Sequence, residues 1–213
     1  MIVLIQQGEV LLFALLLVAL ILSLTFHEFG HAFVAKLYGD PTAERAGRLT
    51  LNPLAHIDLM GLAMVVLVGF GYAKPVPTYP RNFRSKRADL WVAAAGPAMN
   101  LALAAVAWNF FLGMRMAGVE YFAEPGPQTF FVVLVQVNLL LMVFNLIPLG
   151  PLDGHYILPH FLPAAAARTY REYNQRFGVY ALLALIVLAI LGVPVFGYVM
   201  SMAAALLPYI TFV

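Results

Sequence analysis

Two histidines and a glutamate near residue 30 have the types and the spacing that suit metal chemistry. His27 and His31 lie four residues apart at the end of an apolar run that begins near Val10, and Glu28 follows His27 directly. Side chains at positions i and i+4 of a helix leave the same face, so both imidazoles can bind one cation. In the His-Glu-x-x-His pattern the glutamate acts as a general base. The motif supplies two ligands, whereas a catalytic zinc site uses three protein ligands and a water.

The composition is that of a membrane protein. Hydrophobic residues make up 63% of the chain and charged residues 10%, whereas soluble domains are about half apolar and about a quarter charged. We therefore expect an all-α polytopic membrane protein that forms one domain over residues 1–213. Its expected partners include the lipid bilayer and exclude nucleic acid. The chain contains no cysteine. Disulfides and thiolate ligands are thus excluded, and zinc would be held by histidine and carboxylate.

Long apolar runs predict where the chain crosses the membrane. The predicted spans are residues 10–37, 88–114, 130–145, 177–191 and 195–213, and a shorter apolar piece covers residues 59–72. That piece is short for a crossing and suits a re-entrant or interfacial position. The sequence therefore predicts five to six membrane segments. A core over about residues 10–160 carries the motif, and accessory spans occupy about residues 177–213.

Lysine and arginine residues mark the loops expected on the cytoplasmic side. They follow the first span, gather between residues 74 and 87, and return between residues 168 and 176. Because basic loops stay in the cytoplasm, the first span should run from outside to inside. His27, about 26 Å from Val10 at 1.5 Å per residue, should then lie near the cytoplasmic face. Loops around Arg45, Arg84 and Arg171 are placed inside and Glu120 outside.

The third ligand is predicted from the end of the third clear span. The stretch from Asn145 to Gly154 contains Asp153, two prolines and two glycines, and such a segment cannot continue a helix. Irregular backbone at membrane depth is tolerated where protein buries it or a wet cavity borders it. Parity of crossings, helix length and charge bias place Asp153 at the level of His27 and His31. Asp153 is therefore the predicted third ligand, and a turn-capping role is the alternative.

A short β element is predicted after the first span. Polar residues alternate with apolar ones over residues 47–53, which is the pattern of a strand, and Pro53 ends it. This strand, which carries Asn52, would hold a substrate by strand addition. The extended residues 74–80 are the alternative segment for that role.

Two further polar residues lie near the predicted site. His56 is either an accessory group near the metal or a structural residue at a loop boundary. Asn100 is polar inside the span 88–114 and should face the bundle interior at about the depth of His27. A hydrogen bond that joins helices is as consistent with the sequence as a functional role for Asn100.

Together these motifs resemble the site-2 protease family of intramembrane zinc metalloproteases. The resemblance rests on HEFGH in the first span, GPAMN in the second and N-x-x-P-x-x-x-x-D-G after the third, and it covers about residues 20–160. LTLNPLAHID and GYAKPVP are similar to a compact prokaryotic branch without a PDZ domain. The resemblance implies zinc held by His27, His31 and Asp153, with Glu28 as the catalytic base.

The resemblance also implies roles for residues around the metal. It places Asn145 and Asn100 along the site, with Asn145 as an oxyanion or substrate contact. Asn100, Asn52 and His56 are the candidate substrate contacts. His155, beside the Asp-Gly pair, departs from the family pattern, and it would either compete for the metal or orient Asp153.

The expected function is hydrolysis of a peptide bond within or near a transmembrane helix of a single-span or other membrane-protein substrate. We expect one zinc per chain, in a prokaryotic cell membrane, with the active site toward the cytoplasmic side. A membrane zinc hydrolase acting on lipid amides or esters would use the same residues. A metal transporter would need polar groups through the full membrane thickness, whereas here they cluster at one level. A non-proteolytic zinc-binding protein is a further alternative, and the oligomeric state is left open.

Overall fold

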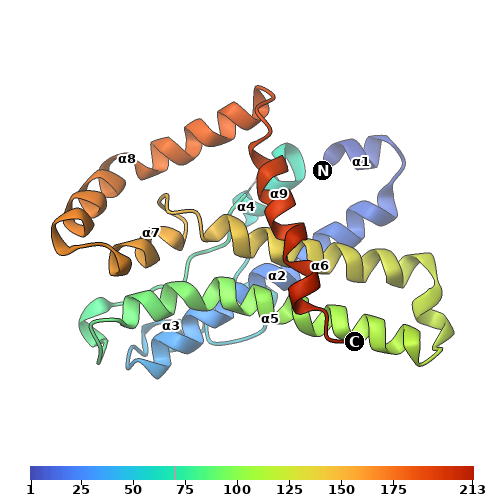
Figure 1. The fold of residues 1–213 in the computed structure, drawn as a ribbon, viewed down its shortest axis with the longest axis horizontal. Coiled ribbons are helices and arrows are strands. Elements are labelled where there is room, and N and C mark those ends of the chain that lie inside the picture. Colours follow the sequence, from blue (N-terminus) through green and yellow to red (C-terminus); the bar gives the residue numbers. More distant parts are fainter. Residues whose placement is uncertain (70) are drawn as a thin grey trace.

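The computed structural model describes residues 1–69 and 71–213, which form helices joined by turns and extended loops (Figure 1). The longest helices are α2 (Val10–Leu37), α5 (Ala88–Met116), α6 (Pro125–Asn145) and α8 (Ala164–Ile190). The shorter ones are α1 (Ile2–Gln6), α3 (Thr42–Arg45), α4 (Leu59–Val68), α7 (Gly154–Ile157) and α9 (Val195–Ala205). Single 3-10 turns are η1 (Pro53–Ala55), η2 (Pro80–Asn82), η3 (Glu120–Ala123), η4 (Leu158–Phe161) and η5 (Leu207–Ile210).

Four of the described helices, α2, α5, α6 and α8, are long and apolar enough to cross a membrane. The all-α class predicted from the sequence is confirmed, but four candidate spans are found where five to six segments were expected. Helix α9 has 11 residues, and the rest of the predicted span 195–213 turns into η5 around Pro208. Helix α4 has 10 residues, fewer than the roughly 20 of a full crossing. Phe70, inside the predicted piece 59–72, lies outside the described residues.

The strand predicted over residues 47–53 is wrong, because no part of the described chain is assigned as a strand. The polar side chains there bind the local backbone instead of marking one face of a sheet. The Thr50 hydroxyl accepts from the N–H of Asn52 at 3.1 Å, and the Asn52 side chain accepts from the N–H of Leu54 at 3.1 Å and so caps η1. Such local bonds compete with strand pairing, so a period-two pattern here indicates a loop.

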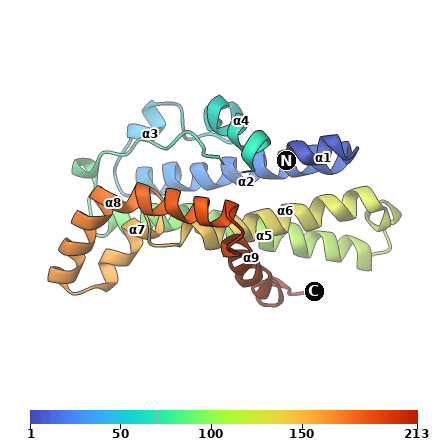
Figure 2. The ribbon, with the colours of Figure 1, turned by 90° about the horizontal axis from the view of Figure 1, so that it is seen from above.

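Helices α2, α5 and α6 form the centre of the fold and alternate in direction (Figure 1). Figure 2 shows α3 and α4 on one side of α2, whereas α5, α6 and α9 lie on the other side of it. The buried cluster between the central helices combines small residues with larger apolar ones: Ala19, Ala104, Ala107, Leu134 and Leu139. Small residues let helix backbones approach closely in a membrane, where packing rather than the hydrophobic effect holds helices together.

One glycine from each helix lets α2 and α5 approach closely. A Cβ atom on Gly30 would lie 2.8 Å from the carbonyl oxygen of Ala95, and one on Gly96 would lie 2.6 Å from Nε2 of His27. Real Cβ atoms essentially never come so close to a neighbour. Gly30 belongs to HEFGH and Gly96 to GPAMN. The glycines therefore let the two motifs pack directly against each other.

Two buried side chains fix the extended residues 71–79 to the rest of the molecule. Arg48 donates to the carbonyls of Lys74 and Pro75, near the middle of the stretch. At its end, the fully buried Asp40 accepts from the N–H of Tyr79 at 2.6 Å. Burial alone would raise the pKa of Asp40, but hydrogen bonds from Asn82, Thr42 and Tyr79 outweigh it, so the pKa lies below its usual range.

Helix α8 stands apart from the central helices and changes direction along its length (Figures 1 and 2). It starts at Ala164, so residues 168–176, which were predicted as a basic loop, are helical. Only 11% of its most apolar window is buried, against 44% for α5. Helix α8 is thus the most exposed of the four candidate spans.

The chain end after α9 is tied to the far half of α5. The Asn109 amide donates to the carbonyl of Ile210 at 2.6 Å and accepts from the N–H of Phe212 at 2.7 Å. The indole N–H of Trp108 donates to the Thr211 hydroxyl at 2.9 Å. These bonds hold the last described residues to α5 without involving the His-Glu-x-x-His segment.

Candidate metal centre

His27 and His31 of α2 and Asp153, just before α7, form the one cluster of potential metal ligands found in the described part of the chain. The two Nε2 atoms are 3.1 Å apart. Asp153 oxygens lie 3.2 Å from Nε2 of His27 and 3.4 Å from Nε2 of His31. The fold therefore brings together the three ligands predicted from residues far apart in the sequence.

The hydrogen bonds around the cluster indicate what it binds. Nδ1 of His31 lies 2.7 Å from the carbonyl oxygen of Val92, which can only accept, so Nδ1 carries the proton and Nε2 of the neutral ring is free. Nδ1 of His27 lies 2.6 Å from Oδ1 of Asn100 in the same way. Oδ2 of Asp153 is buried and receives no hydrogen bond. Three electron-pair donors thus converge without a proton between them, an arrangement that a cation stabilises.

The spacing of these atoms suits zinc. Tetrahedral bonds of about 2.0–2.1 Å place neighbouring ligand atoms about 3.3 Å apart. The two Nε2 atoms are 3.1 Å apart, Oδ2 of Asp153 lies 3.2 Å from that of His27, and Oδ1 of Asp153 lies 3.4 Å from that of His31. Two imidazoles and one carboxylate are also a donor set of catalytic zinc sites, in which the fourth position is left to water or substrate. The residues present therefore fit a zinc ion.

A buried amide network lies behind His27. Asn100 donates to the carbonyl of Ser23 at 3.1 Å and to Oδ1 of Asn138 at 2.8 Å, and Asn138 donates to the carbonyl of Leu134 at 2.8 Å. Asn100 and Asn138 are both fully buried. Asn100 touches the edge of the His27 ring opposite Asp153, so its observed contact is with the ligand. A substrate contact for Asn100 stays a prediction.

Asn138 was not identified from the sequence, although a signal was present. It is an amide within the predicted span 130–145, and a polar side chain at that depth is costly unless it has partners. The same reasoning had pointed to Asn100. Applied to every polar residue of a predicted span, it would have found Asn138 as well.

The backbone around Asp153 is compact and contacts α8. A Cβ atom on Gly154 would lie 2.5 Å from the carbonyl oxygen of Ile147, so only glycine fits after Asp153. The Tyr170 hydroxyl donates to the carbonyl of Pro148 at 2.7 Å, and Asn174 accepts from the N–H of Gly150 at 2.9 Å. Helix α8 therefore supports the loop that carries the third ligand.

Glu28 is buried beside the cluster and is not part of the ligand set. It is near enough to interact electrostatically with His31 and with Arg48. Burial lowers the pKa of Arg48, and the charge of Glu28 opposes that shift. A carboxylate that adjoins the ligands without binding the metal is available to move protons.

Asn145 and His155 have local partners. The Asn145 amide donates to the carbonyl of Leu141 at 2.9 Å, within its own helix. Nδ1 of His155 donates to the carbonyl of Leu152 at 2.9 Å, and its ring packs on Tyr156 with centroids 3.7 Å apart. His155 lies outside the cluster of ligands found among the described residues. The predicted oxyanion or substrate contact of Asn145 stays a prediction.

Asn52 and His56 belong to the loop between α3 and α4. Asn52 is exposed and caps η1. His56 is 1% exposed, and its Nε2 donates to the carbonyl of Thr50 at 2.8 Å. These contacts stabilise the loop that also carries Arg48, and the predicted substrate contacts of both residues stay predictions.

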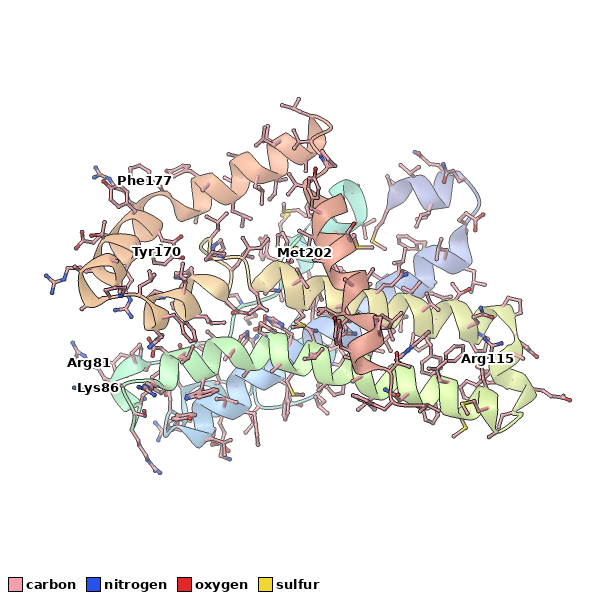
Figure 3. All side chains as sticks on the ribbon, viewed as in Figure 1. Arg81, Lys86, Arg115, Tyr170, Phe177 and Met202 are labelled. Atoms are coloured by element: carbon pink, nitrogen blue, oxygen red, sulfur yellow. The ribbon has the colours of Figure 1, made fainter. Side chains whose placement is uncertain are left out.

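The basic loops gather at one end of the molecule. Figure 3 places Arg81 and Lys86 at the end of the bundle where α5 begins, and Arg115 at the opposite end. Tyr170, whose hydroxyl supports the Asp153 loop, lies on the part of α8 nearer to Arg81 than to Arg115.

Comparison with known proteins identifies the family. Residues 15–189 match peptidase family M50. YwhC of Bacillus subtilis (strain 168), named as a candidate zinc metalloprotease, is 43% identical over 151 residues, which cover 70% of this chain and 69% of that protein. Rip2 of Mycolicibacterium smegmatis, named in the same way, is 36% identical over 162 residues, which cover 71% of this chain. The match spans 59% of Rip2, less than two thirds of its length.

A more distant relative extends the match. MJ0611 of Methanocaldococcus jannaschii, also named as a candidate zinc metalloprotease, is 26% identical over 197 residues, which cover 91% of this chain and 83% of that protein. No solved structure gives a significant match. The family match includes all three clustered ligands and most of the four candidate spans. The chain therefore belongs to peptidase family M50, the site-2 protease family of zinc metalloproteases, and is an integral membrane protein.

Proposed function

We propose that the chain is an intramembrane zinc endopeptidase that hydrolyses a peptide bond within or near a transmembrane helix of a membrane-protein substrate. The observation that carries this proposal is the convergence of His27, His31 and Asp153 beside the buried Glu28, on helices long enough to cross a membrane. Membership of a zinc metalloprotease family supports the peptidase chemistry. The position of the cluster within the helical bundle supports a substrate that is itself a membrane segment.

One zinc per chain would be held by the two Nε2 atoms and by Asp153, since the described residues offer a single ligand cluster. When bound, zinc lowers the pKa of water to about 7 and polarises a carbonyl oxygen. Nδ1 of His27 donates to Asn100 and Nδ1 of His31 donates to the Val92 carbonyl. Both Nε2 lone pairs are therefore directed to the same point.

Glu28 supplies the proton transfers. It takes a proton from the attacking water while the water oxygen bonds to the substrate carbonyl carbon, and it gives that proton to the leaving nitrogen as the C–N bond breaks. The products are one carboxyl terminus and one amino terminus. Arg48 is held in place by two backbone carbonyls and lies near enough to Glu28 for the two side chains to interact electrostatically.

Cleavage of a single-span substrate by the purified protein in detergent tests the proposal. Glu28→Gln removes the base but no ligand, so zinc should stay bound while the rate falls about 10²–10⁴-fold. Glu44→Gln is the matched control, because Glu44 is exposed and pairs with Lys36 at 2.6 Å on the surface. It should cleave like the unaltered protein, and a chelator should stop both.

Two results would overturn the proposal. Normal cleavage by Glu28→Gln would remove the base from the mechanism. Release of fatty acid or amine from added lipid, with the peptide left intact, would favour the lipid hydrolase that uses the same residues.

We also place the metal centre toward the cytoplasmic side of the membrane. The basic loops that support this orientation lie at the α5 N-terminal end (Figure 3). Single cysteines introduced as Arg84→Cys and Glu120→Cys can be labelled selectively, since the chain has no native cysteine. Labelling from outside the cell should reach position 120 and not position 84, and the reverse pattern would invert the orientation.

A further inference from the structure

The amide network behind His27 has a fixed direction. Asn138 lies 2.8 Å from the carbonyl oxygen of Leu134, a group that only accepts, so its Nδ2 must face that carbonyl and its Oδ1 must face Asn100. A rotated Asn138 amide would bring two acceptors together at Leu134 and two donors together at Asn100. The backbone of α6 therefore sets the orientation of Asn138.

Two neighbouring acceptors fix the orientation of the Asn100 amide. Its Nδ2 donates both to Oδ1 of Asn138 at 2.8 Å and to the carbonyl oxygen of Ser23 at 3.1 Å. Both donor hydrogens of the amide are then used, and Oδ1 is left to face Nδ1 of His27 at 2.6 Å. The only hydrogen bond compatible with that contact is one that His27 donates from Nδ1.

We infer that Asn138 is a positioning residue for the metal centre, acting through Asn100 to keep the proton of His27 on Nδ1 and its Nε2 free for the metal. This inference rests on the proposed zinc function. It deepens that function by assigning a role to a third-span side chain that touches no ligand directly. The network runs from α6 through α5 to α2, so the helix that leads to Asp153 also sets the donor atom of His27.

Burial makes the network effective. Asn100 and Asn138 are fully buried, and His27 is 5% exposed, so water cannot replace a lost partner without cost. Groups that bond directly to a metal ligand typically contribute about 10–100-fold to metal affinity. Asn138 is one hydrogen bond further away, and its removal should therefore weaken zinc by about 10-fold, the lower end of that range.

The first test reads the tautomer of His27 without metal and without substrate. Nitrogen-15 NMR of histidine-labelled, zinc-free protein, at a pH where the rings are neutral, distinguishes Nδ1–H from Nε2–H, and His27→Ala assigns the signal. The unaltered protein should show His27 as the Nδ1–H form. A predominant Nε2–H form would overturn the inference whatever the protein cleaves, so this result is separate from a failure of the proposed protease function.

Two variants of Asn138 then test the network. Asn138→Leu removes both hydrogen bonds, so the Nε2–H form of His27 should become detectable and the zinc dissociation constant should rise about 10-fold. Asn138→Asp should restore both properties, because a buried carboxyl group is kept neutral and can donate to Leu134 while accepting from Asn100. If Asn138→Leu does not fold, the Asp variant and the tautomer of the unaltered protein still decide the question.

Asn109→Leu is the matched control on α5. Asn109 also donates to a carbonyl one turn earlier in its helix, at 2.8 Å, but its other partners are in the chain end after α9. The change should lower thermal stability and leave the tautomer and the zinc affinity unaltered. Equal losses of zinc affinity in Asn138→Leu and Asn109→Leu, or no change in the His27 tautomer of Asn138→Leu, would reduce Asn138 to a packing residue.

Discussion

The central helices and α8 are all long and apolar, yet they are held in different ways. Helices α2 and α5 meet where Gly30 and Gly96 let their backbones approach, and buried amides connect them to α6. Helix α8 is joined to the Asp153 loop by the side chains of Tyr170 and Asn174 and packs through Leu182. Length and hydropathy therefore identify helices that can cross a membrane, whereas small residues and buried polar groups identify those that position a site.

Loss of both imidazoles should have the largest effect, because it removes the ligands that α2 contributes. His27→Ala combined with His31→Ala leaves Asp153 alone, and elemental analysis of the purified protein should then find no zinc. His155→Ala is the control, since His155 bonds to Leu152 and not to the cluster. Zinc retained by the double variant would show that the central helices do not hold the metal.

Gly96→Ala should weaken zinc strongly by disturbing the contact between α2 and α5. The new methyl group would lie 2.6 Å from Nε2 of His27, so the imidazole must move away from its ligand position. We expect the zinc dissociation constant to rise by at least about 100-fold, more than is typical for loss of a group behind a ligand. Chelator competition measures it.

Gly113→Ala serves as the matched control for this change. Gly113 lies on the same helix as Gly96, and a Cβ atom there would meet nothing within 4 Å. It should leave zinc unchanged and raise stability by up to about 1 kcal/mol. Similar zinc affinities for the two variants would mean that the close helix contact does not position His27.

Asp40→Asn should have a smaller effect, on stability rather than on the metal. The Asp40 carboxylate accepts from Tyr79 and Asn82, and its loss should cost about 1–3 kcal/mol at pH 7. Its folded pKa lies below the unfolded value of about 3.9, so its contribution is present above that pH and is lost as the pH falls through the folded pKa. Thermal unfolding should therefore separate the variant from the unaltered protein at pH 7 and less so below about pH 4.

Tyr170→Phe should have the smallest effect and tests the outer helix. It removes the hydrogen bond to Pro148, worth about 0.5–1.5 kcal/mol, and should lower stability while zinc affinity stays the same. Tyr173→Phe is the control, since Tyr173 is exposed on the same helix and packs on Phe177. If Tyr170→Phe weakened zinc as much as Gly96→Ala, α8 would belong with the central helices.

The parts of the fold that depend on local properties could be predicted from the sequence. The first span was predicted at residues 10–37 and α2 has the same bounds. The second was predicted at residues 88–114, and α5 extends two residues further, to Met116. Apolar length and the bias of basic residues are both readable without tertiary structure. The same two properties also predicted Asp153 at the level of the histidines, and the structure brings Asp153 together with His27 and His31.

The parts that depend on contacts between segments could not be predicted in the same way. Residues 168–176 lack an apolar pattern and suggested a loop, but they belong to the first half of α8, where Tyr170 and Asn174 bond to the Asp153 loop. The strand predicted at residues 47–53 failed because Thr50 and Asn52 satisfy nearby backbone groups. The role proposed for Asn138 depends on Asn100, which lies on another helix.

The anchoring of residues 71–79 has a consequence for self-association. An extended, exposed segment normally offers a row of N–H groups on which another chain can build a sheet and begin to aggregate. Here residues 75, 77 and 80 are prolines, which have no N–H to offer. Between the anchors at Pro75 and Tyr79, only Val76 and Thr78 carry an N–H. The stretch can therefore remain extended at the protein surface while being a poor template for fibre growth.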